Sequence, residues 1–199
     1  WKENFITLHK TKDGQDNLSN AYKRLVFDEI CANFIILSNN RKKIKRKKIK
    51  KFFKSIISEQ ILKNLPFTLT QGQKKVLDEI NLDLKSATRM FRILQGDVGS
   101  GKTIVSFLSI ANIVESNHQC ALMATTEILA KQHFKLAKKI FENTKINIDL
   151  LTGKTEIKKR KKIIDNLENG KIDFVIGTHS LFQKKINFKS LGLAVIDEQ

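Results

Sequence analysis

The 199-residue sequence predicts an α/β fold in which helices cover both faces of a parallel β-sheet. Three observations support this prediction. Short apolar segments of strand length alternate with segments of helical spacing through the second half of the chain. A glycine-rich loop lies between one apolar segment and one helical segment. Strands separated by helices pair in parallel, and burial on both faces explains why such strands are apolar throughout.

The first third of the chain is predicted to be helical. Apolar residues recur every three or four positions over residues 18–37, and the same spacing returns over residues 52–61. A strongly basic run over residues 41–51 separates the two patterns. This run is interpreted either as the solvated face of a connector or as a nucleic-acid contact. Pro66, the only proline, ends the second helix, because it lacks an N–H and disfavours the helical conformation of the residue before it.

Beyond Pro66 the sequence alternates between helices and strands. Thr70 suits the N-cap of a helix over residues 73–84, because its hydroxyl can accept from the free amides of the first turn. Residues 91–95 form an apolar segment that predicts a short strand, and a helical pattern follows over residues 104–114. Further strands are predicted over residues 119–124, 146–151, 174–177 and 193–196, and further helices over residues 127–141 and 155–167.

The glycine-rich loop has the spacing G-x-x-x-x-G-K-[ST], which is typical of phosphate-binding loops between a strand and a helix. Glycines allow the backbone to wrap closely, so that successive N–H groups face phosphate oxygens. The N-terminus of the following helix adds about half a positive charge. Lys102 is expected to reach the β and γ phosphates, and the Thr103 hydroxyl to ligate Mg²⁺. The predicted nucleotide-binding residues are Gly96, Asp97, Val98, Gly99, Ser100, Gly101, Lys102 and Thr103.

Two carboxylates follow the last predicted strand. Asp197 and Glu198 come directly after residues 193–196, at the sheet edge that the phosphate loop also faces. Asp197 is expected to hold Mg²⁺ through water, and Glu198 to orient and deprotonate the attacking water. Lys102, Asp197 and Glu198 are therefore the predicted catalytic residues.

Composition narrows the class of partner and the compartment. The chain carries 37 Lys and Arg against 20 Asp and Glu, a net charge of +17, which supports a polyanionic partner such as nucleic acid. Cys31 and Cys120 are interpreted as buried apolar residues in a reducing compartment. The sequence shows neither a membrane-spanning run nor a signal-peptide pattern, so we expect a cytoplasmic location. Because the sequence starts at Trp1 without an initiator Met, we expect a piece of a longer chain.

These blocks resemble the superfamily 2 helicases, whose motifs I and II match the phosphate loop and residues 197–199. The resemblance implies a RecA-like lobe of the P-loop NTPase class, preceded by a helical linker region. It also implies ATP and Mg²⁺ as cofactors. Residues 67–73 resemble the adenine-reading element of these enzymes, in which the side chain of Gln73 pairs with the base.

Three further blocks resemble the motifs that hold the DNA backbone in superfamily 2 helicases. They cover residues 124–133, 151–154 and 176–183. Each follows a predicted strand and begins a helix, so hydroxyls and free amides are available to phosphates. The implied DNA-binding residues are Thr126, Glu127, Thr152, Gly153, Gly177, Thr178 and His179.

Within the superfamily the chain resembles the RecG family of fork-reversal helicases. The competing family is that of the transcription-repair coupling DNA translocases, and Ser100 and Gln199 favour the RecG family. The resemblance implies an ATP-dependent helicase that contacts the backbone of branched or duplex DNA. Such an enzyme remodels stalled forks and Holliday junctions in DNA recombination and repair, and is associated with the bacterial nucleoid.

The same resemblance implies a domain organisation. Residues 1–65 are expected to form a helical linker between a wedge domain and the motor, and residues 66–199 the first ATP-binding lobe, truncated at motif II. The wedge domain and the second RecA-like lobe of the full-length protein are expected outside this chain, which would leave the isolated piece weak or inactive. Two alternatives stay open: a phosphotransferase that uses the loop on a small substrate, and a fragment that binds nucleotide or DNA without turnover.

Overall fold

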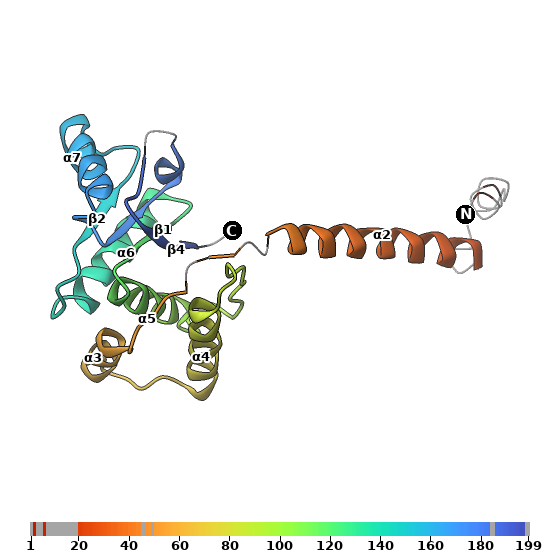
Figure 1. Cartoon of the computed structure of the whole chain (residues 1–199), viewed down its shortest axis with the longest axis horizontal. Helices are drawn as coiled ribbons and strands as arrows, with labels where there is room; N and C mark the ends of the chain where they lie inside the picture. Colours follow the sequence, from red (N-terminus) through yellow and green to blue (C-terminus); the bar gives the residue numbers. More distant parts are fainter. Residues whose placement is uncertain are drawn as a thin grey trace. The chain divides into compact units, whose positions relative to one another are not determined.

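The computed structural model describes residues 2, 6, 20–44, 47–48, 50–183 and 186–197, and it divides into two compact units, Trp1–Lys48 and Ile49–Gln199 (Figure 1). The first unit contains the helix α2 (Asn20–Ile44), which confirms the helical pattern predicted over residues 18–37 for all but residues 18 and 19, which lie outside the described residues. Several large apolar side chains of α2, including Phe34 and Ile35, are exposed. The predicted domain boundary between residues 65 and 66 stays a prediction for the longer protein.

The second unit is built on a parallel sheet of four strands in the order β2-β3-β1-β4. All three pairings are parallel, which confirms the predicted α/β class. β1 and β3 lie in the middle of the sheet, and each of their residues is buried. The strands are β1 (Gln119–Met123), β2 (Ile148–Leu151), β3 (Phe174–Gly177) and β4 (Leu191–Ile196).

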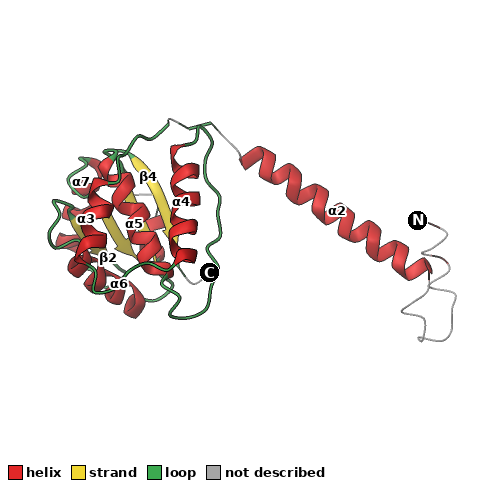
Figure 2. Cartoon of the chain, turned by 90° about the horizontal axis from the view of Figure 1, so that it is seen from below, coloured by secondary structure: helices red, strands yellow, loops and turns green. Residues whose placement is uncertain are grey.

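Helices cover both faces of the sheet (Figure 2). Successive side chains of a strand alternate between the faces. Cys120 and Leu122 therefore join one apolar cluster, while Ala121 joins the other. The connection from β1 to β2 and the connection from β2 to β3 run in opposite directions across the sheet, so right-handed crossovers place their helices on opposite faces. One face carries α3 (Ile56–Asn64), α4 (Gln71–Lys85), α5 (Lys102–Glu115) and α6 (Glu127–Ile140), and the other carries α7 (Ile157–Glu168) and the 3-10 helix η1 (His179–Phe182).

Three aromatic rings form the centre of the larger apolar cluster. Phe107 of α5, Phe141 after α6 and Phe174 of β3 lie with ring centroids 5.8 to 6.0 Å apart, in tilted and edge-to-face arrangements. Such pairs stabilise by about 0.5–1.5 kcal/mol beyond their buried area. The cluster joins α5 and α6 to the middle of the sheet and so fixes the two helices whose first turns carry predicted site residues.

The helix boundaries around Pro66 confirm the sequence prediction. α3 ends at Asn64, and Leu65 is extended with φ −74° and ψ 140°. Thr70 then caps α4 in a capping box, because its hydroxyl accepts from the amide of Gln73 while the Gln73 side chain accepts from the amide of Thr70. The capping box places Gln73 beside Ser100 and Gly101, where the phosphate loop leads into α5.

The prediction of a strand over residues 91–95 is wrong. The segment forms no strand, and its largest side chains are exposed, Phe91 by 83% and Ile93 by 91%. Arg92 instead pairs with Glu79 and Asp83 of α4, at 2.8 and 2.9 Å. A strand needs a neighbouring strand for its backbone groups, and among the described residues none pairs with this segment, whose Arg92 side chain is bonded to α4.

Residues 50–55 do not continue the helix predicted over residues 52–61. Ser55 has φ 65°, a left-handed conformation that stops helical propagation before α3. Glu115 at the end of α5 accepts from the amides of Lys54 and Ile57, at 2.6 and 3.3 Å. The buried Lys51 donates to the carbonyl of Gly192, and this burial lowers the pKa of its ammonium. Residues 50–55 are therefore tied by hydrogen bonds to α5 and to β4.

Cys120 is fully buried, and burial raises the pKa of its thiol well above the ordinary range. This confirms that Cys120 is a buried apolar residue, whereas Cys31 on α2 is half-buried. Within the described ranges, none of the helices has the length and apolar character needed to span a bilayer.

Candidate nucleotide and DNA site

The topology brings the predicted site residues to one edge of the sheet. α5 packs against β1, and its C-terminus is followed closely in the chain by the first residue of β1. The N-terminus of α5 therefore lies at the carboxyl edge of the sheet. Thr126, Thr152, Thr178 and Asp197 follow the carboxyl ends of β1, β2, β3 and β4. Ligands of open parallel sheets bind at this edge. The geometry therefore brings together the two halves of the predicted site, the phosphate loop and the DNA-binding loops.

The phosphate loop depends on two glycines with positive φ. Gly99 has φ 81°, and Gly101, the N-cap of α5, has φ 84°. A side chain at Gly101 would also collide with the amide nitrogen of Gln73. The loop is closed by a backbone hydrogen bond from Ser100 to Asp97, at 3.1 Å. Residues 96–100 are exposed, so a phosphate in solvent can reach the loop that leads into the N-terminus of α5.

Lys102 folds back over the loop. Its ammonium donates to the carbonyl oxygens of Gly96 and Asp97, at 2.7 and 2.9 Å. These two bonds hold the ammonium group of Lys102 against the glycine-rich loop. Phosphate oxygens are stronger acceptors for an ammonium than neutral carbonyls, because the bond is then between opposite charges.

Gln73 connects the start of α4 to the phosphate loop. Its side-chain oxygen accepts from Thr70, at 2.9 Å, and its side-chain nitrogen donates to the carbonyl of Ser100, at 2.8 Å. Both ends of the side-chain amide are therefore bonded within the protein. Adenine reading by Gln73 stays a prediction, and it requires that the amide exchange these bonds for bonds to the base.

Asp197 forms a contact that the sequence analysis missed. Its amide continues the pairing of β4 with β1 by donating to Met123, at 2.9 Å. Its carboxylate Oδ2 lies 2.7 Å from Nε2 of His133, a buried residue of α6. Ala130, His133 and Ala137 form the buried stripe of α6, and a histidine on such a stripe needs a polar partner. That spacing was the available signal. Glu198, the predicted general base, lies outside the described residues, as does Gln199.

The described donors fit a magnesium ion that arrives with a nucleotide. Within the described part of the chain, no group of three or more His, Cys, Asp or Glu side chains could hold a metal by itself. Mg²⁺ in nucleotide sites keeps several waters and takes few protein oxygens, with phosphates supplying the rest. The hydroxyl of Thr103 at the start of α5 and the carboxylate of Asp197 are oxygen donors of this kind. Their role stays a prediction.

Two of the predicted DNA-binding loops are joined through the first turn of α6. Thr126 caps this helix by accepting from the amide of Leu129, at 3.2 Å. The carboxylate of Glu127 accepts from the amide of Lys154, at 3.2 Å, and pairs with its ammonium, at 3.6 Å. Gly153 packs against the same carboxylate. The loops after β1 and β2 therefore form one connected surface.

The loop after β3 is more closely packed. A side chain at Gly177 would collide with the carbonyl of Leu151 in the neighbouring strand, so the sheet itself requires glycine there. The hydroxyl of Thr178 lies 3.2 Å from that of Ser180. Thr152 and Thr178 are both buried, whereas His179 is exposed. DNA contact by these residues stays a prediction. The amide of Thr152 donates to the hydroxyl of Thr155, at 2.9 Å.

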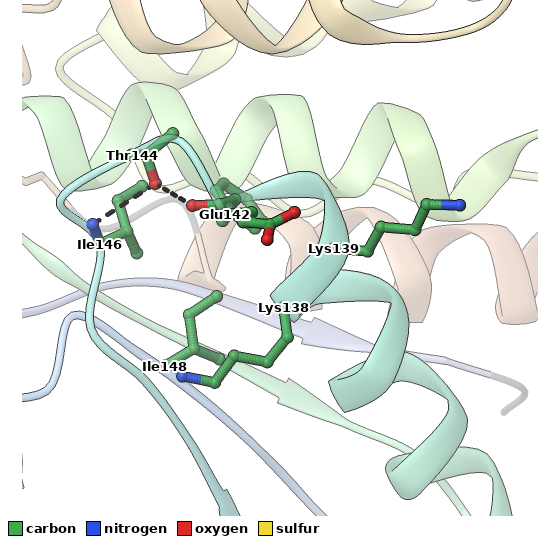
Figure 3. Close-up of a pocket in the computed structure, with 7 residues that line it drawn as sticks. Lys138, Lys139, Glu142, Thr144, Ile146 and Ile148 are labelled. Carbon is green, nitrogen blue, oxygen red and sulfur yellow. Dashed lines mark hydrogen bonds between the residues drawn. The ribbon is translucent and has the colours of Figure 1, made fainter.

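A shallow pocket of about 610 Å³ lies at the other end of α6 (Figure 3). It is formed where α6 ends and β2 begins, at the amino edge of the sheet, and Thr144 bonds the intervening turn. The pocket is therefore separate from the nucleotide and DNA site. Its lining residues are Lys138, Lys139, Phe141, Glu142, Thr144, Ile146 and Ile148.

Comparison with known proteins agrees with this geometry. The family profile described as DEAD/DEAH box helicase matches residues 70–199. The ATP-dependent DNA helicase RecG of Thermotoga maritima is 42% identical over 184 residues, which cover 92% of this chain and 24% of that protein. The RecG of Aquifex aeolicus is 38% identical and covers 96% of this chain and 25% of its own length. The chain thus spans about a quarter of the length of these relatives.

Two solved structures show the same fold. A structure of RecG bound to a three-way DNA junction superimposes with a TM-score of 0.82 at 42% identity, over 90% of this chain and 25% of that one. A hypothetical ATP-dependent RNA helicase from Sulfolobus tokodaii superimposes with a TM-score of 0.55 at 22% identity, over 71% of this chain and 40% of that one, a likeness in fold alone. The predicted RecA-like fold and the predicted similarity to RecG helicases are confirmed, and the chain belongs to the DEAD/DEAH box helicase family.

Proposed function

We propose that the intact protein containing this chain is an ATP-dependent DNA helicase of the RecG type, which couples ATP hydrolysis to the remodelling of stalled forks and Holliday junctions. The observation that carries the proposal is the convergence of the phosphate loop, Asp197 and the three loops after β1, β2 and β3 on one sheet edge. The match to the helicase family supports it, as does the similarity to RecG proteins, one of which was solved with a three-way DNA junction.

The nucleotide half of the site works by charge and by backbone amides. The first turn of α5 and residues 96–103 surround the phosphates, and Lys102 exchanges its bonds to Gly96 and Asp97 for bonds to phosphate oxygens. The hydroxyl of Thr103 and the carboxylate of Asp197 would hold Mg²⁺, which would supply positive charge at the phosphates. Glu198 orients the attacking water and accepts its proton. Gln73 reads the adenine base.

The DNA half of the site holds the phosphate backbone without reading sequence. The loops after β1, β2 and β3 lie at the carboxyl edge, where amides of these loops and of the helix starts that follow would donate to a backbone phosphate. The residues assigned to this contact are Thr126, Glu127, Thr152, Gly153, Gly177, Thr178 and His179. A second RecA-like lobe and a wedge domain of the intact protein, together with an association with the nucleoid, belong to the same proposal.

The proposal is tested by removing the charge that meets the phosphates. Lys102→Ala in the intact protein should lower ATP hydrolysis at least 100-fold, because the γ phosphate loses a preorganised charge partner worth several kcal/mol. Lys74→Ala changes an exposed lysine of α4 and serves as the matched control, with turnover close to wild type. Hydrolysis is measured with a synthetic three-way junction present. Near-normal turnover by Lys102→Ala contradicts the proposed function.

A further inference from the structure

The contact between His133 and Asp197 holds a predicted magnesium ligand in one orientation. An ionised carboxylate only accepts hydrogen bonds, so Nε2 of His133 must be the donor across the 2.7 Å distance. The His133 side chain is 11% exposed and that of Asp197 30%. Among the described residues, Oδ1 of Asp197 has no hydrogen-bond partner. The bond to Oδ2 therefore fixes the carboxylate while leaving its other oxygen available to a ligand.

The histidine lies on the same rigid helix as the predicted DNA contacts. Thr126 and Glu127 are at the first turn of α6, where Glu127 also binds the loop at Lys154. His133 is seven residues further along, about 10 Å at the rise of an α-helix. A small displacement of the first turn of α6 on DNA binding therefore moves the ring that holds Asp197.

The backbone around Asp197 is anchored independently of this histidine. Asp197 donates its amide to Met123 at the end of β1, and Ala124 donates to Gly177 of β3, at 2.9 Å in both cases. Within the described ranges, the bond between His133 and Asp197 is the one hydrogen bond from an α6 side chain to that carboxylate. Removing it should free the carboxylate without dismantling the sheet edge.

We propose that His133 is a positioning residue that couples DNA occupancy at the first turn of α6 to the orientation of the Asp197 carboxylate. This inference rests on the proposed function. Asp197 binds the magnesium of the nucleotide best when the ring of His133 holds it, and DNA at Thr126 and Glu127 stabilises the position of α6 in which the ring does so. The two ligands consequently strengthen each other's binding, as coupling between two sites requires.

Two variants of the intact protein test the coupling. His133→Leu removes the donor at similar volume, and His133→Gln keeps an N–H donor at similar reach. The readout is the Kd of a fluorescent, non-hydrolysable ATP analogue, measured with and without Mg²⁺ and with and without a three-way DNA junction. Loss of a residue that orients a metal ligand typically costs 10- to 100-fold in affinity or activity. For His133→Leu we expect a Kd weaker by at least 10-fold in the presence of Mg²⁺ and DNA.

The controls separate positioning from a merely structural role. In EDTA the Kd of the analogue should be the same for wild type and His133→Leu, and His133→Gln should recover most of the DNA-dependent gain in affinity. Unchanged coupling in a folded His133→Leu protein overturns the inference and leaves the proposed function standing. If His133→Leu does not fold, His133→Asn takes its place, because its amide is too short to reach Oδ2 of Asp197. A wild-type protein whose Mg²⁺-dependent affinity for the analogue does not change with DNA also overturns the inference, and ATP hydrolysis with and without the junction then tests the proposed function separately.

Discussion

The phosphate loop and the three loops that follow β1, β2 and β3 lie at the same sheet edge but are held in different ways. Residues 96–100 are exposed, and Lys102 and Gln73 hold the loop with polar bonds that a nucleotide can replace. The loops after β2 and β3 are more closely packed, with buried Thr152 and Thr178, and Gly177 lies against the neighbouring strand. The phosphate loop is therefore held by bonds that a ligand can replace, whereas the loops after β2 and β3 are held by packing.

The largest expected effect concerns Gly177, at the end of β3. Gly177→Ala places a methyl group against the carbonyl of Leu151, and overpacking of this kind costs about 3 kcal/mol. Gly99→Ala, in the exposed phosphate loop, is the matched control. Nothing lies within 4 Å of a side chain there, so only the left-handed backbone opposes it, at about 1 kcal/mol.

Hydrogen exchange of the β2 and β3 amides in the intact protein measures the free energy of opening for both glycine variants. We expect Gly177→Ala to accelerate exchange in these strands far more than Gly99→Ala does. Equal effects of the two substitutions would mean that the two halves of the site do not differ in packing.

A smaller effect, on ATP binding, is expected at Gln73 beside the phosphate loop. Gln73→Ala removes the bonds to Thr70 and Ser100, and the loss of about one net hydrogen bond should weaken ATP binding roughly 5- to 10-fold. Gln71→Ala, at an exposed position in the same turn, is the control. The Kd values of ATP and GTP separate the two roles of Gln73. Weaker binding of both nucleotides indicates that the bond to Ser100 supports the phosphate loop, whereas a reduced preference for ATP over GTP indicates adenine reading. Unchanged selectivity would remove the adenine-reading role.

Local pattern was enough to predict most of the fold. The spacing of residues 96–103 identified the loop, and the continuous apolar runs of β1 and β3 identified strands because central parallel strands are buried on both faces. Residues 91–95 look similar in sequence, but five apolar-rich positions do not show whether a partner strand is at hand. Ser55 likewise interrupts a helical pattern through its backbone conformation alone.

The site was predictable where its residues are close in sequence. Thr70 and Gln73 stand three positions apart, and their reciprocal capping follows from that spacing. His133 and Asp197 are separated by 64 positions, so only the packing of α6 on the sheet brings its side chain to the residue that follows β4. The same holds for Glu127 and Lys154, whose contact depends on two loops meeting at one sheet edge.

The proposed function assigns both nucleotide and DNA to one edge of the sheet. The direct test is the rate of ATP hydrolysis of the intact protein with and without a three-way DNA junction, at saturating Mg²⁺ and ATP. A helicase of the proposed kind should hydrolyse ATP at least 10-fold faster when the junction is bound, since DNA at the loops after β1, β2 and β3 completes the site, a gain of about 1.4 kcal/mol or more in transition-state stabilisation. A rate that does not change with the junction would contradict the claim and favour a phosphotransferase that acts on a small substrate.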